Sequence, residues 1–295
     1  MQFVLIAGMH RSGTSCITGE LAACGLHMSH ELLAADATNP SGYFEDPRLI
    51  AIHDRMLTDL GSNWMDPAPF RDGWLDHLEN TGHLASLDSY LQPFREAAAP
   101  LLVKDPRIGR LLPLWRRTIE RHGDDVAVLY IYRNCIEVAM SLWRRNNIPI
   151  LHALQLWARY NLDIQLDLED RHHAGIGFGE FLADNARLAA AMAEIGIELP
   201  APQNLGQIAQ QELPHSVSAE SVARLLPDNF EHPLVTEHGR PSPIDLLELY
   251  AMCGGVKIAE ERRHYATILS TLWTVVNEKK ALEKKLDELR AVLGT

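Results

Sequence analysis

Short apolar runs that end at a polar turn recur along the first two thirds of the chain. The residues from Phe3 to Ala7 are all apolar and end at Gly8, which predicts a strand buried on both faces. The runs 101–103 and 126–132 have the same character, and 175–178 predicts a last short strand. Because helical patterns alternate with these runs, we predict an α/β fold with a P-loop-type parallel β-sheet flanked by helices.

Apolar residues at three- and four-residue spacing predict the helices between these strands. After the first strand, this spacing predicts a helix that ends near Gly25, a residue type typical of helix ends. Further helices are predicted over 48–60, 136–145 and 151–168. Residues 198–243 are rich in Pro, Gln and His without a strong period, so we expect irregular structure with short helices there.

The C-terminal residues 257–295 carry a different pattern, the heptad repeat of a coiled coil. Its seam consists of Tyr265, Ile268, Leu272, Val275, Lys279, Leu282, Leu286, Leu289 and Leu293. We therefore divide the chain into a catalytic-type domain over 1–256 and a C-terminal coiled-coil helix over 257–295, and we expect a homo-oligomer through that helix. Packing of the helix on its own domain, or on another protein, is the alternative.

Charge and composition exclude several classes of partner. The net charge of −12 argues against general binding to nucleic acid or to an anionic membrane. Residues 104–145, however, hold nine Lys/Arg against five Asp/Glu, which indicates an anionic ligand at one site. The apolar start is too short for a secretory signal, no run is long enough for a membrane span, and no CxxC pair is present, so we expect a cytoplasmic protein. None of the 14 histidines forms an HExxH pattern, and no metal is predicted.

A phosphate-cradling loop is predicted between the first strand and the first helix. Residues 8–15 read Gly-Met-His-Arg-Ser-Gly-Thr-Ser, which fits the spacing of a P-loop except that Thr14 stands where a nucleotide hydrolase has Lys. Glycines let successive backbone N–H groups point inward, and the helix N-terminus adds positive potential. Arg11 supplies a cation in place of that Lys, and hydroxyl groups are available; the candidate anion-binding residues are Arg11, Ser12, Gly13, Thr14 and Ser15.

A second arginine follows a later strand. Arg133 lies at the carboxyl end of the 126–132 strand, where ligands bind in open α/β sheets, and Ser141 lies eight residues on in the following helix. An arginine and a hydroxyl from one strand–helix unit can hold a phosphate through charge-assisted hydrogen bonds. An arginine before a helix is common, so this second motif alone does not identify a site.

Together, Arg-Ser-Gly-Thr-Ser at 11–15 and Arg-x-x-x-Glu-Val-Ala-x-Ser at 133–141 resemble the sulfotransferase superfamily, and more narrowly its bacterial family members. The resemblance continues through 39–45, 103–107 and 153–161, and it covers about residues 2–215. It implies that residues 11–15 bind the 5′-phosphosulfate of 3′-phosphoadenosine-5′-phosphosulfate, and that Arg133 and Ser141 bind its 3′-phosphate. The C-terminal Arg-Lys-Gly motif that many eukaryotic members use for the 3′-phosphate is absent from this sequence, so the resemblance does not assign the residues that complete that side.

The resemblance also directs the choice of catalytic residues. The acceptor loses a proton as it attacks sulfur, and Glu45 is our candidate base, with His10 and His53 in reserve. Lys104 could neutralise charge on the bridging oxygen, or it could form a salt bridge with Asp105 or Glu45. Arg107 and His53 are candidates for binding the substrate. The acceptor class is not defined by the sequence, and a glycan hydroxyl is the expectation from the family.

Two other functions remain open from the sequence. A P-loop kinase or phosphotransferase would have the same architecture, but it would need a Lys at position 14 and an acidic magnesium ligand. A catalytically inactive nucleotide-binding protein that assembles through residues 257–295 would keep the loop and the fold without the chemistry.

Overall fold

The sheet of this protein consists of four parallel strands in the order β2-β1-β3-β4. The computed structural model describes residues 2–29, 31–36, 42–96, 99–168, 171–209, 226, 234 and 239–253. The strands are β1 (Gln2–Ala7), β2 (Leu101–Lys104), β3 (Asp125–Tyr132) and β4 (His173–Gly177). The predicted α/β class and all four predicted strands are confirmed, and the last strand begins two residues earlier than its apolar pattern indicates.

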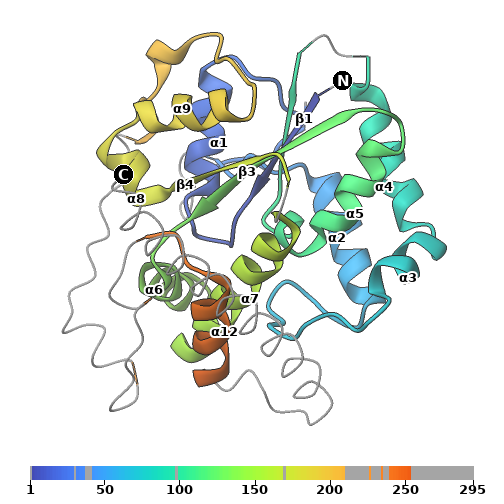
Figure 1. Cartoon of the computed structure of the whole chain (residues 1–295), viewed down its shortest axis with the longest axis vertical. Helices are drawn as coiled ribbons and strands as arrows, with labels where there is room; N and C mark the ends of the chain where they lie inside the picture. The colour runs from blue at the N-terminus through green and yellow to red at the C-terminus, as the bar shows by residue number, and fades with distance from the viewer. Residues whose placement is uncertain are drawn as a thin grey trace, which may run out of the picture.

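Successive residues of β1 point to opposite faces of the sheet, so the strand is apolar throughout because both faces are covered. Phe3 and Leu5 contact the core of one face, and Val4 and Ile6 contact the core of the other. Helices cover both faces (Figure 1). One face is covered by α1 (Thr14–Ala23), α8 (Phe178–Ala183) and α9 (Ala186–Glu194). The other is covered by α2 (Pro47–Asp59), α3 (Trp74–Asn80), α4 (His83–Leu91) and α5 (Ile108–Glu120).

A third apolar core lies beyond the carboxyl ends of the strands. It is formed by α6 (Cys135–Asn146), α7 (Ile150–Leu168) and α12 (Pro243–Met252). Figure 1 shows these three helices grouped at one end of the molecule. Met9, at the start of the loop after β1, packs into this core. The loop that was predicted to bind an anion is therefore held between the sheet and a separate helical layer.

Long-range hydrogen bonds attach the described C-terminal segments to this framework. Gln165 Nε2 of α7 donates to the backbone oxygen of Pro241 at 2.7 Å, just before α12. The buried carboxylate of Glu20 accepts from the backbone N–H groups of Gly206, Ile208 and Ala209 at 2.7–2.9 Å. This second contact follows a short 3-10 helix, η2 (Pro202–Asn204), and fixes the 202–209 segment to α1. In the described part of the segment predicted to be irregular, the observed structure agrees with that prediction.

Several elements were not specified by the sequence pattern. The structure forms α3, α4 and the 3-10 helix η1 (Gln92–Phe94) over residues that we did not assign, and α5 continues from the Lys-Asp-Pro-Arg turn after β2. Their apolar residues, among them Leu78, Leu87 and Trp115, are buried in the core on one face of the sheet. Of these elements, α3, α4 and η1 are too short for a periodic apolar pattern to be recognised in the sequence. Within the described ranges, no helix is long and apolar enough to span a membrane. The predicted coiled coil over 257–295 lies outside the described residues.

Candidate functional site

The loop between β1 and α1 makes a tight turn that depends on glycine at two positions. A methyl group on Gly8 would lie 2.6 Å from the backbone oxygen of Ile131 in β3. Gly13 caps α1 in the left-handed conformation with φ 88°, and Arg11 also has a positive φ of 69°. The N–H of Ser12 donates to the backbone oxygen of Met9 at 3.1 Å, which closes the turn.

Ser12 makes this turn a candidate for binding a ligand. Its side chain is fully buried, and its hydroxyl has no hydrogen-bond partner among the residues that the structure describes. Buried hydroxyl groups are nearly always hydrogen-bonded, and leaving one without a partner costs about 1–3 kcal/mol. The first N–H groups of α1, which begins two residues later, also lack acceptors within the helix. An anion seated at the turn would satisfy both.

The two sequence motifs meet at the carboxyl ends of β1 and β3. Arg11 Nε donates to Ser141 Oγ at 2.8 Å, across 130 residues of sequence. Arg133 Nη1 donates to the backbone oxygen of Arg11 at 3.2 Å. Because β1 and β3 are neighbouring parallel strands, the residues that follow them come to the same edge of the sheet. The structure thus brings Arg11, Arg133 and Ser141 into one cluster.

Arg133 is oriented by its own helix and by an aromatic ring. Its Nε donates to Glu137 Oε2 at 2.6 Å, and its guanidinium carbon lies 5.0 Å from the ring centre of Phe178. Asn134 caps α6 by accepting from the N–H groups of Ile136 at 3.0 Å and Glu137 at 3.3 Å. The arginine is therefore held at the helix N-terminus, where positive potential accumulates.

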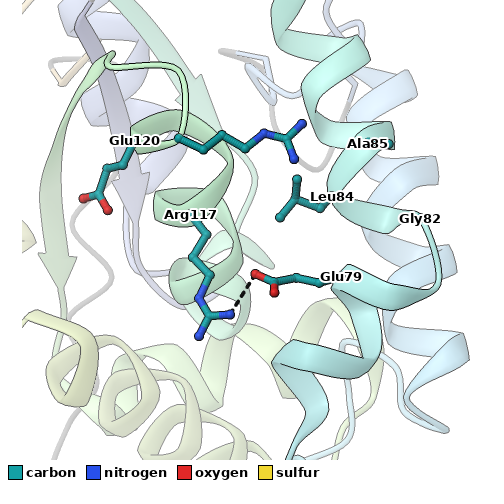
Figure 2. A pocket seen from close by; sticks show the side chains of 7 residues that line it. Glu79, Gly82, Leu84, Ala85, Arg117 and Glu120 are labelled. Carbon is teal, nitrogen blue, oxygen red and sulfur yellow. Dashed lines mark hydrogen bonds and ion pairs between the residues drawn. The ribbon is translucent and has the colours of Figure 1, made fainter.

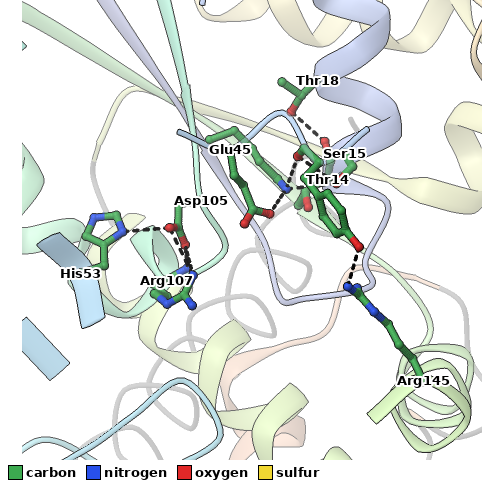
Figure 3. Close-up of polar contacts among 10 residues, drawn as sticks. Thr14, Ser15, Thr18, Glu45, His53, Asp105, Arg107 and Arg145 are labelled. Carbon is green, nitrogen blue, oxygen red and sulfur yellow. Dashed lines mark hydrogen bonds and ion pairs between the residues drawn. The ribbon is translucent and has the colours of Figure 1, made fainter. Parts of the chain in front are cut away.

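Lys104 lies at the end of β2, on the other side of β1, and it is paired rather than isolated. Its Nζ donates to Glu45 Oε1 at 2.5 Å, to the backbone oxygen of Tyr43 at 2.9 Å and to Ser15 Oγ at 3.0 Å. The Lys104 side chain is 1% exposed and that of Glu45 is 11% exposed. Of the two roles considered for Lys104, the structure shows the salt bridge, and its partner is Glu45. Figure 3 shows the side chains of Glu45 and Ser15 converging on the same point.

Arg107 and His53 lie in a buried network around Asp105 (Figure 3). His53 is fully buried, accepts from Trp115 Nε1 at 2.9 Å, and faces Asp105 Oδ2 with Nδ1 at 3.2 Å. Arg107 contacts Asp105 Oδ1 at 3.1 Å and Asp54 Oδ1 at 2.7 Å. Burial acts to raise the pKa of Asp105, but the facing His53 and Arg107 outweigh it and hold that pKa well below its usual range. Substrate contact by His53 does not fit this setting, because both ring nitrogens face protein groups in the interior.

His10, one of the two reserve candidates for catalysis, is held neutral. The residue is half-buried, and its Nε2 is buried without a partner within the described part of the chain. Burial, followed by the nearby charge of Arg107, lowers the pKa of His10 to about 3. The ring lies 4.6 Å from Trp64 and 6.0 Å from Tyr160, measured between ring centres. At neutral pH this imidazole can accept a hydrogen bond but carries no charge.

Two residues of this edge were not singled out from the sequence. The backbone oxygen of Tyr43 accepts from both Ser15 Oγ, at 3.2 Å, and Lys104 Nζ. Arg145 Nη2 donates to the Tyr43 hydroxyl at 2.8 Å from the last turn of α6. The spacing of four residues between Ser141 and Arg145, which places both on one helix face, is the signal that could have identified Arg145.

A shallow depression of about 550 Å³ lies on the surface between α3, α4 and α5 (Figure 2). Arg117 and Glu79 at its rim are ion-paired at 2.8 Å, and Arg121 pairs with Asp88 at 2.7 Å. Such exposed pairs already neutralise one another, and α5 ends here beside the amino end of β3, away from the cluster around Arg11. We therefore place the candidate site at the carboxyl edge. Among the described residues, no group of three His, Cys, Asp or Glu side chains is arranged to hold a metal ion.

Comparison with known proteins gives a structural likeness at low sequence identity. No family model and no curated protein sequence matches the chain. Among solved structures, the chain is similar to the sulfotransferase domain of the Synechococcus PCC 7002 olefin synthase, with 17% identity and a TM-score of 0.45 over 88% of this chain and 96% of that one. It is also similar to a sulfotransferase domain of the curacin biosynthetic pathway, with 15% identity and a TM-score of 0.42 over 75% of this chain and 95% of that one. At these values the likeness does not assign a function to this chain.

Proposed function

We propose that this protein is a sulfotransferase that uses 3′-phosphoadenosine-5′-phosphosulfate as its donor. The observation that carries the proposal is the contact between the two motifs. Arg11 Nε donates to Ser141 Oγ at 2.8 Å, and Arg133 Nη1 donates to the backbone oxygen of Arg11 at 3.2 Å. A donor with phosphate groups at both ends of one nucleoside needs two cationic sites at one edge of the sheet. A single phosphate-binding loop would not need the second motif.

The residues around the loop fit such a donor. The buried Ser12 hydroxyl offers a donor without a partner among the described residues. The loop also ends at the N-terminus of α1, where backbone N–H groups are available to a phosphate. Residues 11–15 would hold the 5′-phosphosulfate, and Arg133 with Ser141 would hold the 3′-phosphate. Arg133 already has a counter-charge in Glu137, which keeps its guanidinium oriented before a ligand arrives.

The pair of Lys104 and Glu45 supplies the chemistry in this proposal. When bound, the donor supplies the sulfuryl group, whose bond to the 5′-phosphate oxygen breaks as a bond to the acceptor oxygen forms. Glu45 accepts the proton that the acceptor hydroxyl loses. Lys104 stabilises the negative charge that develops on the departing phosphate oxygen. In the structure these two groups are in contact at 2.5 Å, so Lys104 has to shift one of its hydrogen bonds as the donor binds.

The network around Asp105 has a supporting role in this proposal. The buried contacts of His53 and Asp105 anchor the turn that follows Lys104, and Arg107 is held by two carboxylates. We propose that Arg107 borders the acceptor side while His53 orients Asp105 from the interior. His10, neutral and directed away from solvent at Nε2, is a hydrogen-bond acceptor available beside the loop.

The donor is tested by calorimetric titration with 3′-phosphoadenosine-5′-phosphate in parallel with ATP and magnesium. We expect the bisphosphate to bind and ATP to bind more weakly or not at all. Arg133→Ala should weaken the bisphosphate about 100-fold, because a charge-assisted hydrogen bond to a buried anion contributes about 2–3 kcal/mol. Arg117→Ala on α5 removes the same charge from a surface pair and should leave the affinity unchanged. A preference for ATP would contradict the proposal and favour a kinase.

The chemistry and the acceptor need a second assay. Transfer of radiolabelled sulfate from the donor into fractions of a cell extract identifies the acceptor class, for which we propose a glycan hydroxyl on the family resemblance alone. Glu45→Gln should abolish transfer while leaving bisphosphate binding intact. Binding without transfer into any fraction would instead favour an inactive nucleotide-binding protein. A cytoplasmic location and assembly through residues 257–295 remain part of the same proposal.

A further inference from the structure

One face of α6 carries three residues at intervals of four, and each contacts a different part of the candidate site. Glu137 contacts Arg133, Ser141 contacts Arg11, and Arg145 contacts Tyr43. Residues four apart lie one above another on a helix. The proposed donor-binding residues account for the first two contacts. The third contact, by Arg145, has no role in the function proposed above.

Tyr43 connects Arg145 to the pair that carries the proposed chemistry. Its side chain reaches α6, where the ring lies 5.3 Å from the Arg145 guanidinium carbon and the hydroxyl accepts from Nη2 at 2.8 Å. Its backbone oxygen accepts from both Lys104 and Ser15. Figure 3 shows Arg145 extending from its helix toward the group that contains Ser15 and Glu45. A single residue thus joins the end of α6 to the proposed catalytic lysine.

The backbone directly after Tyr43 is strained at Phe44. Gly42 has φ 94° and Phe44 has φ 54°, so Tyr43 stands between two residues in the left-handed region. For an aromatic residue this conformation costs on the order of 1 kcal/mol, and it persists only where surrounding contacts enforce it. The Phe44 ring packs against Gly19 of α1, where an added methyl group would lie 2.7 Å from the ring. The Tyr43 hydroxyl also donates to Asp36 at 2.7 Å, so the phenol is held on two sides.

We propose that Arg145 is a positioning residue that acts through Tyr43 to hold Lys104 and Ser15 against the sulfuryl end of the donor. This inference rests on the proposed function, because it assigns Arg145 to one end of that donor. The Lys104 ammonium has three N–H donors, and the structure shows three bonds from it, one of them to Tyr43. If Tyr43 loses the Arg145 contact, Asp36 remains as the partner of its hydroxyl, and we expect the backbone oxygen that Lys104 and Ser15 share to be held less firmly.

The effect of Arg145 on the pKa of His10 indicates that Arg145 lies beside the candidate site. Burial is the main cause that lowers the pKa of His10, and the Arg145 charge adds to that effect. Arg145 therefore lies near the loop as well as near Tyr43. Its neighbour Arg144 is exposed and carries the same charge one position earlier, about 100° around the helix. Arg144 is the matched control.

The test compares two ligands that differ only in the sulfuryl group. Calorimetry with the sulfated donor and with 3′-phosphoadenosine-5′-phosphate is carried out on the wild type, Arg145→Ala and Arg144→Ala. Arg145→Ala should weaken the sulfated donor about tenfold, as expected for the loss of about 1.4 kcal/mol, and the bisphosphate by less than about threefold. Arg144→Ala should change neither affinity. A role for Arg145 in general stability would weaken both ligands equally.

Tyr43→Ala and the double variant Tyr43→Ala/Arg145→Ala show whether the effect passes through the tyrosine. We expect the double variant to bind the sulfated donor as Tyr43→Ala alone does, since both changes remove the same connection. Additive losses would overturn the inference, as would an Arg145→Ala variant that binds both ligands like the wild type. A wild-type protein that binds neither ligand would instead overturn the proposed function, so the two failures are distinguishable.

Discussion

Two helices of this protein, α1 at the candidate site and α4 beside the surface depression, begin with a glycine in nearly the same backbone conformation. Gly13 has φ 88° and ψ 7°, and Gly82 has φ 83° and ψ 4°. A methyl group on Gly13 would lie 2.1 Å from the Phe178 ring, whereas one on Gly82 would have nothing within 4 Å. Both positions need a residue that accepts a positive φ, but of the two only Gly13 is also packed closely against another side chain.

The ion pairs of the two regions also differ in burial, and the pair at the candidate site is the more buried one. The side chains of Lys104 and Glu45 are 1% and 11% exposed, and those of Arg117 and Glu79 are 48% and 28% exposed. An exposed pair contributes about 0–1 kcal/mol because water and salt screen it, whereas a buried charge left without its partner costs several times more. The charges at the carboxyl edge therefore depend on their partners within the fold, whereas those on the α3–α5 surface remain in contact with water.

Removing one partner from each pair tests this difference most strongly. Lys104→Met leaves the Glu45 carboxylate buried without its counter-charge, and we expect a loss of about 3–5 kcal/mol in the free energy of unfolding. Arg117→Met should cost no more than about 1 kcal/mol. Urea denaturation of both variants gives the two values. Adding Glu45→Leu to Lys104→Met should recover part of the stability. Equal losses for Lys104→Met and Arg117→Met would show that burial does not distinguish the two ion pairs.

The two glycines provide the next largest contrast. Gly13→Ala combines a left-handed backbone with a clash against Phe178, and we expect it to cost about 3 kcal/mol in unfolding free energy. Gly82→Ala meets only the backbone penalty, about 1–2 kcal/mol. Thermal or urea unfolding measures both. The binding of 3′-phosphoadenosine-5′-phosphate should be lost in Gly13→Ala and kept in Gly82→Ala; loss in both variants would mean that the clash does not matter.

The smallest expected effect is a pH dependence of stability that depends on His10. Because its folded pKa is lowered to about 3 from 6.5, the unfolded chain takes up a proton below pH 6.5 that the folded protein refuses. The stabilisation is fully present above pH 6.5 and is lost as the pH falls toward 3. By pH 5.5 we expect a loss of about 1 kcal/mol relative to pH 7.5. His10→Asn should flatten this part of the stability profile, and an unchanged slope would show that His10 titrates normally.

The strands and the two candidate anion-binding motifs could be predicted from the sequence because each is local. Apolar runs such as Phe3 to Ala7 define a strand buried on both faces, and the Gly8–Ser15 spacing defines a turn before a helix. That Arg11 and Arg133 share one edge followed from the resemblance and from the rule for parallel strands, and the structure shows them in contact. The short helices α3 and α4 were missed because their burial depends on the sheet, not on a long period.

What the sequence determined by itself was the kind of strand, the turn chemistry of the loop and the presence of two cationic motifs, since these depend on residues a few positions apart. Only the tertiary structure decided the state of each charged group. It paired Lys104 with Glu45 across 59 residues, it enclosed His53 between Trp115 and Asp105, and it placed Arg145 on Tyr43 across 102 residues. The physical reason is that burial and the distance between charges control these interactions, and both arise only when distant segments pack together.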